Sequence, residues 1–233
     1  MNSNVSKVLP FLEGLDIFAD FGADDLNELA AASKFKRAAP GEVIFLEDAK
    51  PIGGFFASRG KIVLKKTTHK KKSITTQLLG YGDPFGILTA VQGQAYPLTA
   101  ESLSESVYLH IEQTALEETI SKVPSFRDQL IKMCSERMRG SHNLIAKLAD
   151  ASSETRVAAS ILMFGSKFGV SKGDGLEIGV TRQELAALAG TTVETCIRVT
   201  RHLENDGVLK FPKLKTITVL DSNTLEMLCG RSN

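Results

Sequence analysis

The sequence has few cysteines, no long apolar run and almost no net charge. Its three cysteines, Cys134, Cys196 and Cys229, include no Cys-x-x-Cys pair, which argues against a disulfide scaffold or a structural zinc site and indicates a reducing cytoplasm. No apolar stretch approaches the ~20 residues that a membrane-spanning helix needs. The first thirty residues carry four aspartates and lack a basic start, so no signal peptide is expected. A net charge of +1 neither requires nor excludes a nucleic-acid partner.

Short strands separated by glycines dominate the first half of the chain. Five segments are rich in β-branched or aromatic residues: 42–46, 54–57, 61–64, 74–79 and 106–111. Glycines interrupt them at the spacing of ~8–12 residues that is typical of antiparallel sandwiches and barrels. A short helix is predicted before them, over residues 24–32. With 42% hydrophobic residues, the chain can bury a sizeable core.

After residue 111 the apolar spacing becomes helical. A short helix is predicted over 112–121, and Pro124 suits the first turn of a long helix that runs to Asp150. Two adjacent apolar stripes on this helix predict that one face packs on the sheet domain and another on a partner helix. A single wide stripe facing the core is the alternative. Serines at 152 and 153 end the long helix, and a new helix is predicted over 156–168.

The most specific pattern lies between residues 180 and 209. Thr181 and Glu184 have the spacing of a capping box, which starts a helix at Arg182. Gly190 is the residue type that ends a helix in a left-handed conformation, and Thr192 can cap a second helix. Two helices joined by so short a turn are typical of a helix-turn-helix, whose second helix enters the major groove of DNA.

The second helix carries the residues that we expect to read bases. Arg198 can donate two hydrogen bonds to guanine, and Glu194 can accept one from cytosine. The alternative is a surface ion pair between them, worth only ~0.2–0.5 kcal/mol. Residues 209–219 are predicted to form a hairpin with Lys213 and Lys215 at its tip, placed like a wing that touches phosphates. An ordinary solvated hairpin is the alternative for the wing.

At this point the sequence resembles the Crp/Fnr superfamily of bacterial transcription regulators, over nearly its whole length. The resemblance is carried by Pro40-Gly-Glu-Val-Ile-Phe, Gly82-Asp-Pro-Phe-Gly and Thr192-Val-Glu-Thr-Cys-Ile-Arg, the last closest to the Fnr-like branch. It implies an α+β fold: a cyclic-nucleotide-binding-type β jelly roll over 1–123, a dimerisation helix over 124–150 and a winged helix-turn-helix over 151–233. It also implies a cytoplasmic bacterial homodimer that binds a palindromic double-stranded DNA site and contacts RNA polymerase.

The resemblance and the helical pattern together assign two sets of residues. The DNA-binding set comprises Arg182, Thr192, Val193, Glu194, Thr195, Ile197, Arg198, Arg201, Lys213 and Lys215. The dimer interface comprises Phe126, Leu130, Met133, Cys134, Arg137, Met138, Leu144, Ile145 and Leu148.

The family's cyclic-AMP cassette is altered in this chain. In members that bind cyclic AMP, a glutamate holds the ribose and an arginine holds the phosphate. Here Ile87 takes the glutamate's place, and Tyr96 and Pro97 replace the arginine and serine. Isoleucine cannot accept a hydrogen bond, and nothing in the cassette supplies a bidentate phosphate donor. Cyclic-AMP control is therefore not expected, and the cysteines of an Fnr-type iron–sulfur cluster are also missing.

An apolar effector pocket is expected to remain in the jelly roll. Its predicted lining is Phe85, Gly86, Ile87, Leu88, Tyr96, Pro97, Leu98 and Thr99. Relatives without the cyclic-nucleotide residues include sensors of nitric oxide through haem and sensors of small organic acids or phenols. Haem needs an axial ligand, for which His69, His110, His142 and Cys134 are available. A regulator that binds DNA without any effector is equally compatible.

Two function classes compete with a DNA-binding regulator. A metal-dependent β-barrel enzyme needs clustered ligands, but the four histidines are scattered and include no His-x-His pair. We therefore predict neither catalytic nor metal-binding residues. A winged-helix protein that acts only as a protein-interaction module is the other alternative; salt-sensitive binding to duplex DNA would separate it from a regulator.

Overall fold

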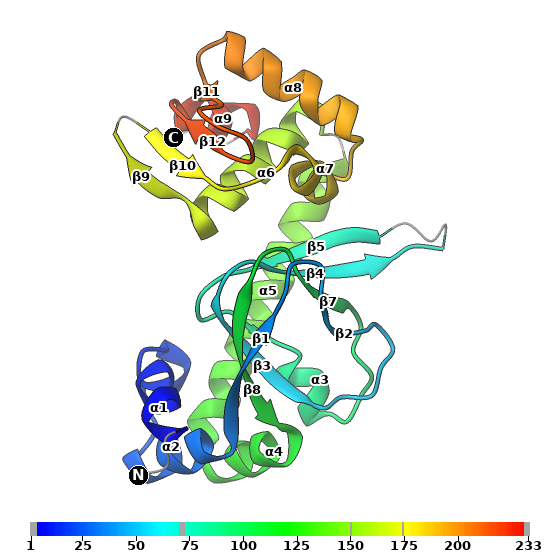
Figure 1. Cartoon of the computed structure of the whole chain (residues 1–233). Coiled ribbons are helices and arrows are strands. Elements are labelled where there is room, and N and C mark those ends of the chain that lie inside the picture. The colour runs from blue at the N-terminus through cyan, green and yellow to red at the C-terminus, as the bar shows by residue number, and fades with distance from the viewer. Residues whose placement is uncertain (1–3, 70–72, 150, 174, 231–233) are drawn as a thin grey trace. The chain divides into compact units, whose positions relative to one another are not determined.

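The computed structural model describes residues 4–69, 73–149, 151–173 and 175–230, without the side chains of Arg137 and residues 140–149. The chain divides into two compact units, shown in Figure 1. The first comprises Met1–Lys66 and Leu79–His142, and the second comprises Thr67–Leu78 and Asn143–Asn233. The predicted boundaries at residues 123 and 150 stay a prediction. Among the described residues, no helix has both the length and the apolar character needed to cross a membrane.

Two four-stranded sheets form the β domain, which belongs to the first unit apart from residues 67–78. One sheet has the order β1-β8-β3-β6, with β1 Ser33–Ala38, β8 Ser106–Glu112, β3 Gly53–Arg59 and β6 Pro84–Phe85. The other has the order β2-β7-β4-β5, with β2 Val43–Phe45, β7 Thr99–Ser102, β4 Ile62–Thr67 and β5 Ser73–Leu79. The five strands predicted from composition are confirmed, and the predicted antiparallel pairing is seen between β3 and β8.

Both faces of the β3–β8 sheet are buried, because successive side chains of a strand point to opposite faces. Phe55 and Tyr108 face a core between the two sheets. Phe56 and Leu109 face a second core that is built with helices. These helices are α1 Val5–Glu13, α2 Ala23–Ala31, α3 Ile87–Val91, α4 Gln113–Lys122 and α5 Pro124–Ala149.

Helix α5 begins at Pro124 as predicted, but two residues of its predicted dimer interface lie inside the protomer's own core. Phe126 and Leu130 are 0% and 3% exposed within the helical core of their own protomer. Their assignment to the dimer interface is therefore wrong, because their side chains have no surface left for a partner. Met133 packs against the same core, Cys134 is half-buried and Met138 is 60% exposed. The side chains of Arg137, Leu144, Ile145 and Leu148 lie outside the described part.

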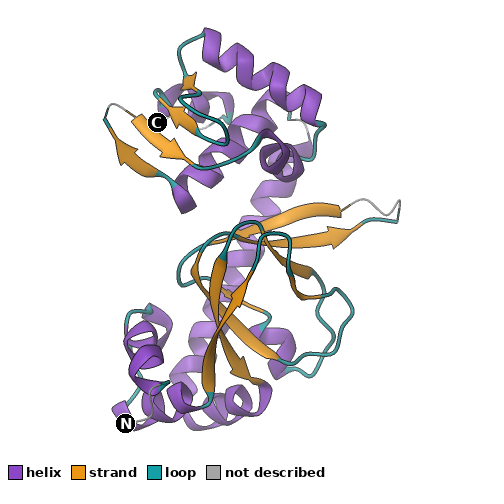
Figure 2. Ribbon diagram, in the orientation of Figure 1, coloured by secondary structure: helices purple, strands orange, loops and turns teal. Residues whose placement is uncertain are grey.

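Besides most of β5 and the end of α5, the described part of the second unit contains four helices and a small sheet, coloured by type in Figure 2. The helices are α6 Ser153–Phe168, α7 Arg182–Ala189, α8 Val193–Asn205 and α9 Ser222–Leu228. The sheet has the order β11-β12-β10-β9, with β9 Val170–Lys172, β10 Gly175–Ile178, β11 Leu209–Lys210 and β12 Ile217–Val219. Helix α6 supplies Val157, Ile161 and Phe164 to the core, each 0% exposed.

Candidate DNA interface and sensor core

Local hydrogen bonds set the ends of the two helices α7 and α8, as the sequence predicts. The Thr181 hydroxyl accepts from the Glu184 amide at 3.1 Å, and the Glu184 carboxylate accepts from the Thr181 amide at 2.6 Å. Gly190 ends α7 in the left-handed region, with a φ of 60°. Thr192 caps α8 by accepting from the Thr195 amide at 3.2 Å. The capping box, turn and second cap of a helix-turn-helix are therefore confirmed.

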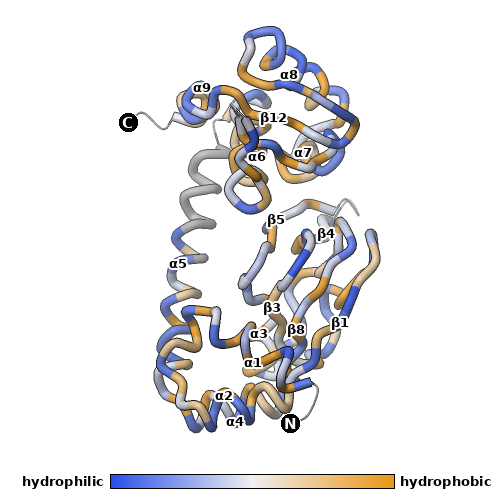
Figure 3. Tube along the Cα trace, turned by 60° about the vertical axis from the view of Figure 1, so that its left-hand side comes forward, coloured by the Kyte–Doolittle hydropathy of each residue, from blue (hydrophilic) through white to orange (hydrophobic). Residues whose placement is uncertain are grey.

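Helix α8 has one buried and one exposed face, and Figure 3 shows polar and apolar residues alternating along it. Cys196 and Leu203 are 0% and 1% exposed and fix the helix to the core. Burial raises the pKa of the Cys196 thiol to about 11, so the thiol stays protonated and unreactive at neutral pH. The charged side chains of Glu194 and Arg198 point away from this core and are exposed.

The exposed face of α8 borders an open hollow. Its lining consists of Glu194, Ile197, Arg198, Arg201, His202 and Asn205. The backbone amide of Glu194 and the Thr192 hydroxyl lower the pKa of the Glu194 carboxyl, which keeps it ionised as a hydrogen-bond acceptor. Within the described part of the chain, no ion pair of 4.0 Å or less joins Glu194 to Arg198. The Arg198 guanidinium is therefore not held by Glu194.

The wing is the hairpin of β11 and β12, an antiparallel pair. Lys213 and Lys215 lie exposed in its loop, and Lys215 has a positive φ of 60°. The Lys213 ammonium lies 3.7 Å from the Glu177 carboxylate of β10. The guanidinium of Arg182 stacks on Phe211, its Cζ 3.8 Å from the ring centroid. Phe211 was missed in the sequence because nothing local predicts which side chain a wing aromatic will meet.

All ten predicted DNA-binding residues lie in the second unit, in three groups. One group follows α8, another is Arg182 at the start of α7, and the third is the wing loop. Thr192, Val193, Glu194, Arg198 and Arg201 are exposed, whereas Thr195 and Ile197 are half-buried. Thr195 bonds to the Thr192 cap, so part of its role is to start the helix.

In the first unit, Tyr96 fills the space between the two sheets. Its side chain is 0% exposed, and its ring stacks on Phe45 with the centroids 3.8 Å apart. The hydroxyl donates to the Gly53 carbonyl at 2.7 Å and accepts from the Ile52 amide at 3.0 Å. Burial raises the pKa of this phenol, so Tyr96 is neutral and fully hydrogen-bonded.

The prediction of one effector pocket is wrong, because its lining residues do not surround a single cavity. Phe85 and Tyr96 belong to the core between the sheets, with Leu98 beside them, whereas Ile87 belongs to the helical core, with Leu88 beside it. Gly86 lies between the residues of the two cores, and its φ of 68° turns the chain between β6 and α3. A Cβ at Gly86 would lie 3.0 Å from the Tyr96 ring. Pro97 is exposed, and the Thr99 hydroxyl accepts from the Glu47 amide.

His110, the buried candidate for haem ligation, is engaged within the β domain. Its ring stacks on Phe55 with centroids 5.0 Å apart, and Nε2 lies 3.0 Å from the Ile52 carbonyl. Because a carbonyl only accepts, Nε2 carries the proton in this hydrogen bond, and Nδ1 is the unprotonated ring nitrogen. Burial lowers the pKa of His110. His69 is exposed, and the described residues contain no group of three or more His, Cys, Asp and Glu side chains that could hold a metal ion.

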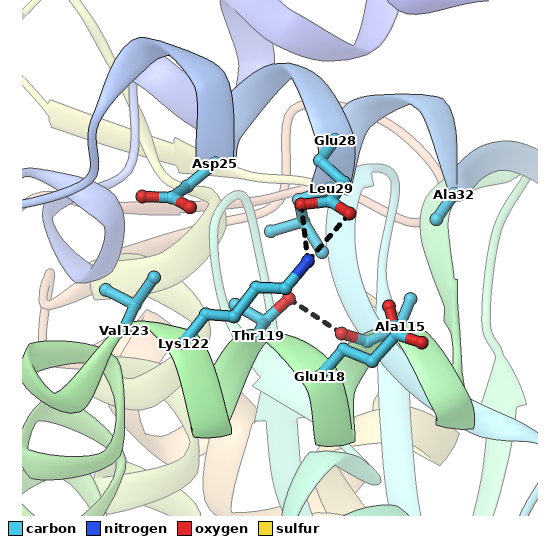
Figure 4. Close-up of a pocket in the computed structure, with 9 residues that line it drawn as sticks. All are labelled: Asp25, Glu28, Leu29, Ala32, Ala115, Glu118, Thr119, Lys122 and Val123. Carbon is cyan, nitrogen blue, oxygen red and sulfur yellow. Dashed lines mark hydrogen bonds and ion pairs between the residues drawn. The ribbon is translucent and has the colours of Figure 1, made fainter.

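Two hollows in the first unit lie away from the predicted pocket. The one in Figure 4 lies between α2 and α4 and has a volume of about 30 Å³, which is room for water rather than an organic effector. Lys122 crosses it and donates to both carboxylate oxygens of Glu28 at 2.8 Å. The other, of about 440 Å³, is an open surface hollow between residues 14–17, residues 81–84 and α5.

Comparison with known families matches both halves of the chain. Residues 35–123 match the cyclic nucleotide-binding domain, and residues 155–228 match the Crp-like helix-turn-helix domain. The first match spans the β domain with α4, and the second spans α6 to α9. The fold and the exposed helix therefore define a protein that joins a cyclic nucleotide-binding-type domain to a DNA-binding domain.

Full-length relatives give the same answer. The chain is 26% identical to electron transport regulator A of Shewanella oneidensis over 90% of this chain and 84% of the relative. It is 25% identical to transcriptional activator protein anr of Pseudomonas aeruginosa over 89% and 84% of the two chains. It is 23% identical to the CRP-like cAMP-activated global transcriptional regulator of Mycobacterium tuberculosis over 79% and 83%.

A solved structure agrees on the fold. FixK2 from Bradyrhizobium japonicum superposes with a TM-score of 0.77 at 19% identity, covering 86% of this chain and 99% of FixK2. The chain belongs to the Crp/Fnr family and is a DNA-binding transcription regulator of that type. Regulators of this family bind DNA and act as dimers.

Proposed function

We propose that this regulator binds a palindromic duplex as a homodimer, reads bases with α8, and is not controlled by cyclic AMP. The observation that carries the DNA-reading part is the exposed face of α8, where Glu194, Arg198 and Arg201 line one open hollow. Two such helices bind half-sites about one DNA turn apart, ~34–36 Å. Selection from a random duplex pool tests this. The expected product is an inverted repeat, and a single unrepeated half-site would contradict it.

The second stripe of α5 supports dimerisation along this helix. Ile131 and Met138 lie seven residues apart and are 58% and 60% exposed, which is the spacing of a seam between two helices. RNA polymerase is the proposed protein partner, because one relative is named a transcriptional activator. The cytoplasm of a bacterium is the proposed location, and no catalytic step is part of the proposal.

Met138→Asp is expected to weaken the dimer by about tenfold or more, because it places a charge where apolar surface is buried. Analytical ultracentrifugation across a concentration series measures the dissociation constant. Gln129→Asp is the matched control: it adds the same charge to the side of α5 that borders the surface hollow. Equal dissociation constants for the two variants would refute the α5 seam.

The packing of Tyr96 supports independence from cyclic AMP. A cyclic nucleotide between the sheets would have to displace a ring that is stacked on Phe45 and hydrogen-bonded at both Ile52 and Gly53. Such displacement opposes binding, because buried polar groups left unpaired cost free energy. Haem at His110 would have to displace the packing of its ring, which is stacked on Phe55 inside the β domain.

Thermal melting with millimolar cyclic AMP tests this independence, and no shift of the melting temperature is expected. A ligand at 100 times its dissociation constant adds about 2.7 kcal/mol, which raises a melting temperature by several degrees. The cAMP-activated relative of Mycobacterium tuberculosis serves as the positive control. An upward shift for this chain would contradict the proposal.

A further inference from the structure

The wing and the helix-turn-helix are joined by one stacked pair. Arg182 is the first residue of α7, and Phe211 directly follows β11, so the two meet across 29 positions of the chain. The guanidinium carbon lies 3.8 Å from the centroid of the ring, well within the ~6 Å range of a cation–π interaction. Both side chains are half-buried, so the stack lies at the surface of the unit.

A separate contact holds the loop of the wing. Glu177 in β10 pairs with Thr218 of β12 in the sheet, and its carboxylate lies 3.7 Å from the Lys213 ammonium. The Thr216 amide donates to the Lys213 carbonyl at 3.3 Å and closes the turn around Lys215. Two contacts therefore hold the wing, one through Phe211 at its base and one through Lys213 in its loop.

Stacking on Phe211 leaves the N–H donors at the edge of the Arg182 guanidinium available. A guanidinium that lies flat on a ring still presents its N–H donors at its edge. Among the described residues, none is joined to the Arg182 guanidinium by a hydrogen bond or ion pair; the guanidinium contacts the Phe211 ring. The stack thus removes freedom from a long flexible side chain without using its donors, which is how a pre-organised phosphate contact is built.

We infer that Phe211 is a positioning residue for DNA binding: it holds Arg182 with its donors directed at a backbone phosphate and fixes the wing beside that phosphate. The inference rests on the proposed function, because it assumes that the wing and α7 face DNA. Phe211 itself touches no base, so its effect is on affinity and not on sequence choice. Without the ring, Arg182 and the wing lysines lose their fixed relation to one another.

Phe211→Leu is the direct test, since leucine keeps an apolar side chain but has no ring face. Affinity is expected to fall about two- to fivefold per half-site, the range of an exposed cation–π contact, and so about four- to 25-fold for the selected inverted repeat. The slope of log affinity against log salt should fall by up to about 1.8, because each phosphate contact contributes about 0.9 and each of the two half-sites loses one. The preferred sequence should be unchanged, and phosphate-ethylation interference should lose one position per half-site.

Three further variants separate positioning from a general loss of stability. Phe211→Tyr keeps the ring face and should retain the wild-type affinity and salt slope. Phe168→Leu makes the same chemical change in another half-buried phenylalanine of this unit and should leave DNA binding unchanged. Arg182→Gln should weaken binding in the wild-type background and have little further effect in Phe211→Leu, since the two residues act as a pair.

Each outcome decides one question. If wild-type protein binds no duplex in a salt-dependent manner, the proposed function fails. If it binds and Phe211→Leu retains full affinity and slope, the inference about Phe211 is overturned while the function stands. Equal losses from Arg182→Gln in both backgrounds would also overturn it. If Phe211→Leu is unfolded at the assay temperature, Phe211→Tyr and Phe211→His are compared at pH 8, where histidine is a neutral ring. Binding that is retained in both variants supports stacking. Binding that is lost in both overturns the inference.

Discussion

Replacing Tyr96 by alanine is expected to lower the free energy of unfolding by about 3–5 kcal/mol, the range for removing a large aromatic side chain from a core. The ring is 0% exposed and stacks on Phe45, so its loss leaves a cavity between the two sheets. The Ile52 amide and the Gly53 carbonyl also lose their side-chain partner. Urea denaturation followed by circular dichroism measures the change.

Two controls divide this loss into its parts. Tyr96→Phe keeps the ring and removes only the hydroxyl, so it should cost about 1–3 kcal/mol for the unpaired buried groups. Tyr81→Ala removes a tyrosine that is 65% exposed and should cost much less. Equal costs for Tyr96→Ala and Tyr81→Ala would show that Tyr96 is not part of the core.

The cavity in Tyr96→Ala also has a chemical test. An apolar space of aromatic size binds small aromatic molecules, and p-cresol has the shape of the missing side chain. Millimolar p-cresol should therefore raise the melting temperature of Tyr96→Ala and leave that of the wild type unchanged. A rise in the wild type as well would mean that the interior already has room for a ligand, against the proposed packing.

The helix-turn-helix could be predicted from the sequence because its signals are local. Thr181, Glu184, Gly190 and Thr192 lie within twelve residues, and each acts on a backbone group in its own turn. The interior of the β domain could not be predicted this way. The Tyr96 hydroxyl bonds to groups 43 and 44 residues away, and only the folded sheets bring these groups together.

Two other misses have related causes. Strand β1 carries Lys34, Lys36 and Arg37, so its composition does not indicate a strand; its pairing with β8, about seventy residues later, forms it. On α5, periodicity shows which positions are apolar but not what covers them. Phe126 and Leu130 therefore appeared available to a partner, although the helical core of their own protomer buries them.

Arg198→Ala is expected to relax base choice at one base pair of each half-site by about 1–3 kcal/mol, the discrimination that one bidentate contact supplies. Arg198 is exposed on α8, in the same hollow as Glu194, and no ion pair joins the two within the described part of the chain. Its guanidinium is therefore available for two hydrogen bonds to guanine. Affinities for duplexes carrying each of the four bases at every half-site position measure this discrimination.

Lys213→Ala is the matched comparison, because it removes a cation of the wing loop instead of α8. It should weaken binding to all duplexes alike and reduce the salt slope, as loss of a phosphate contact does. Glu177 limits this effect. The Lys213 ammonium lies 3.7 Å from the Glu177 carboxylate, so part of its positive charge is already balanced within the protein. If Arg198→Ala instead weakened all duplexes equally and kept the same preferred base, Arg198 would be a phosphate contact. Base reading would then fall to Glu194 and the other exposed residues at the start of α8.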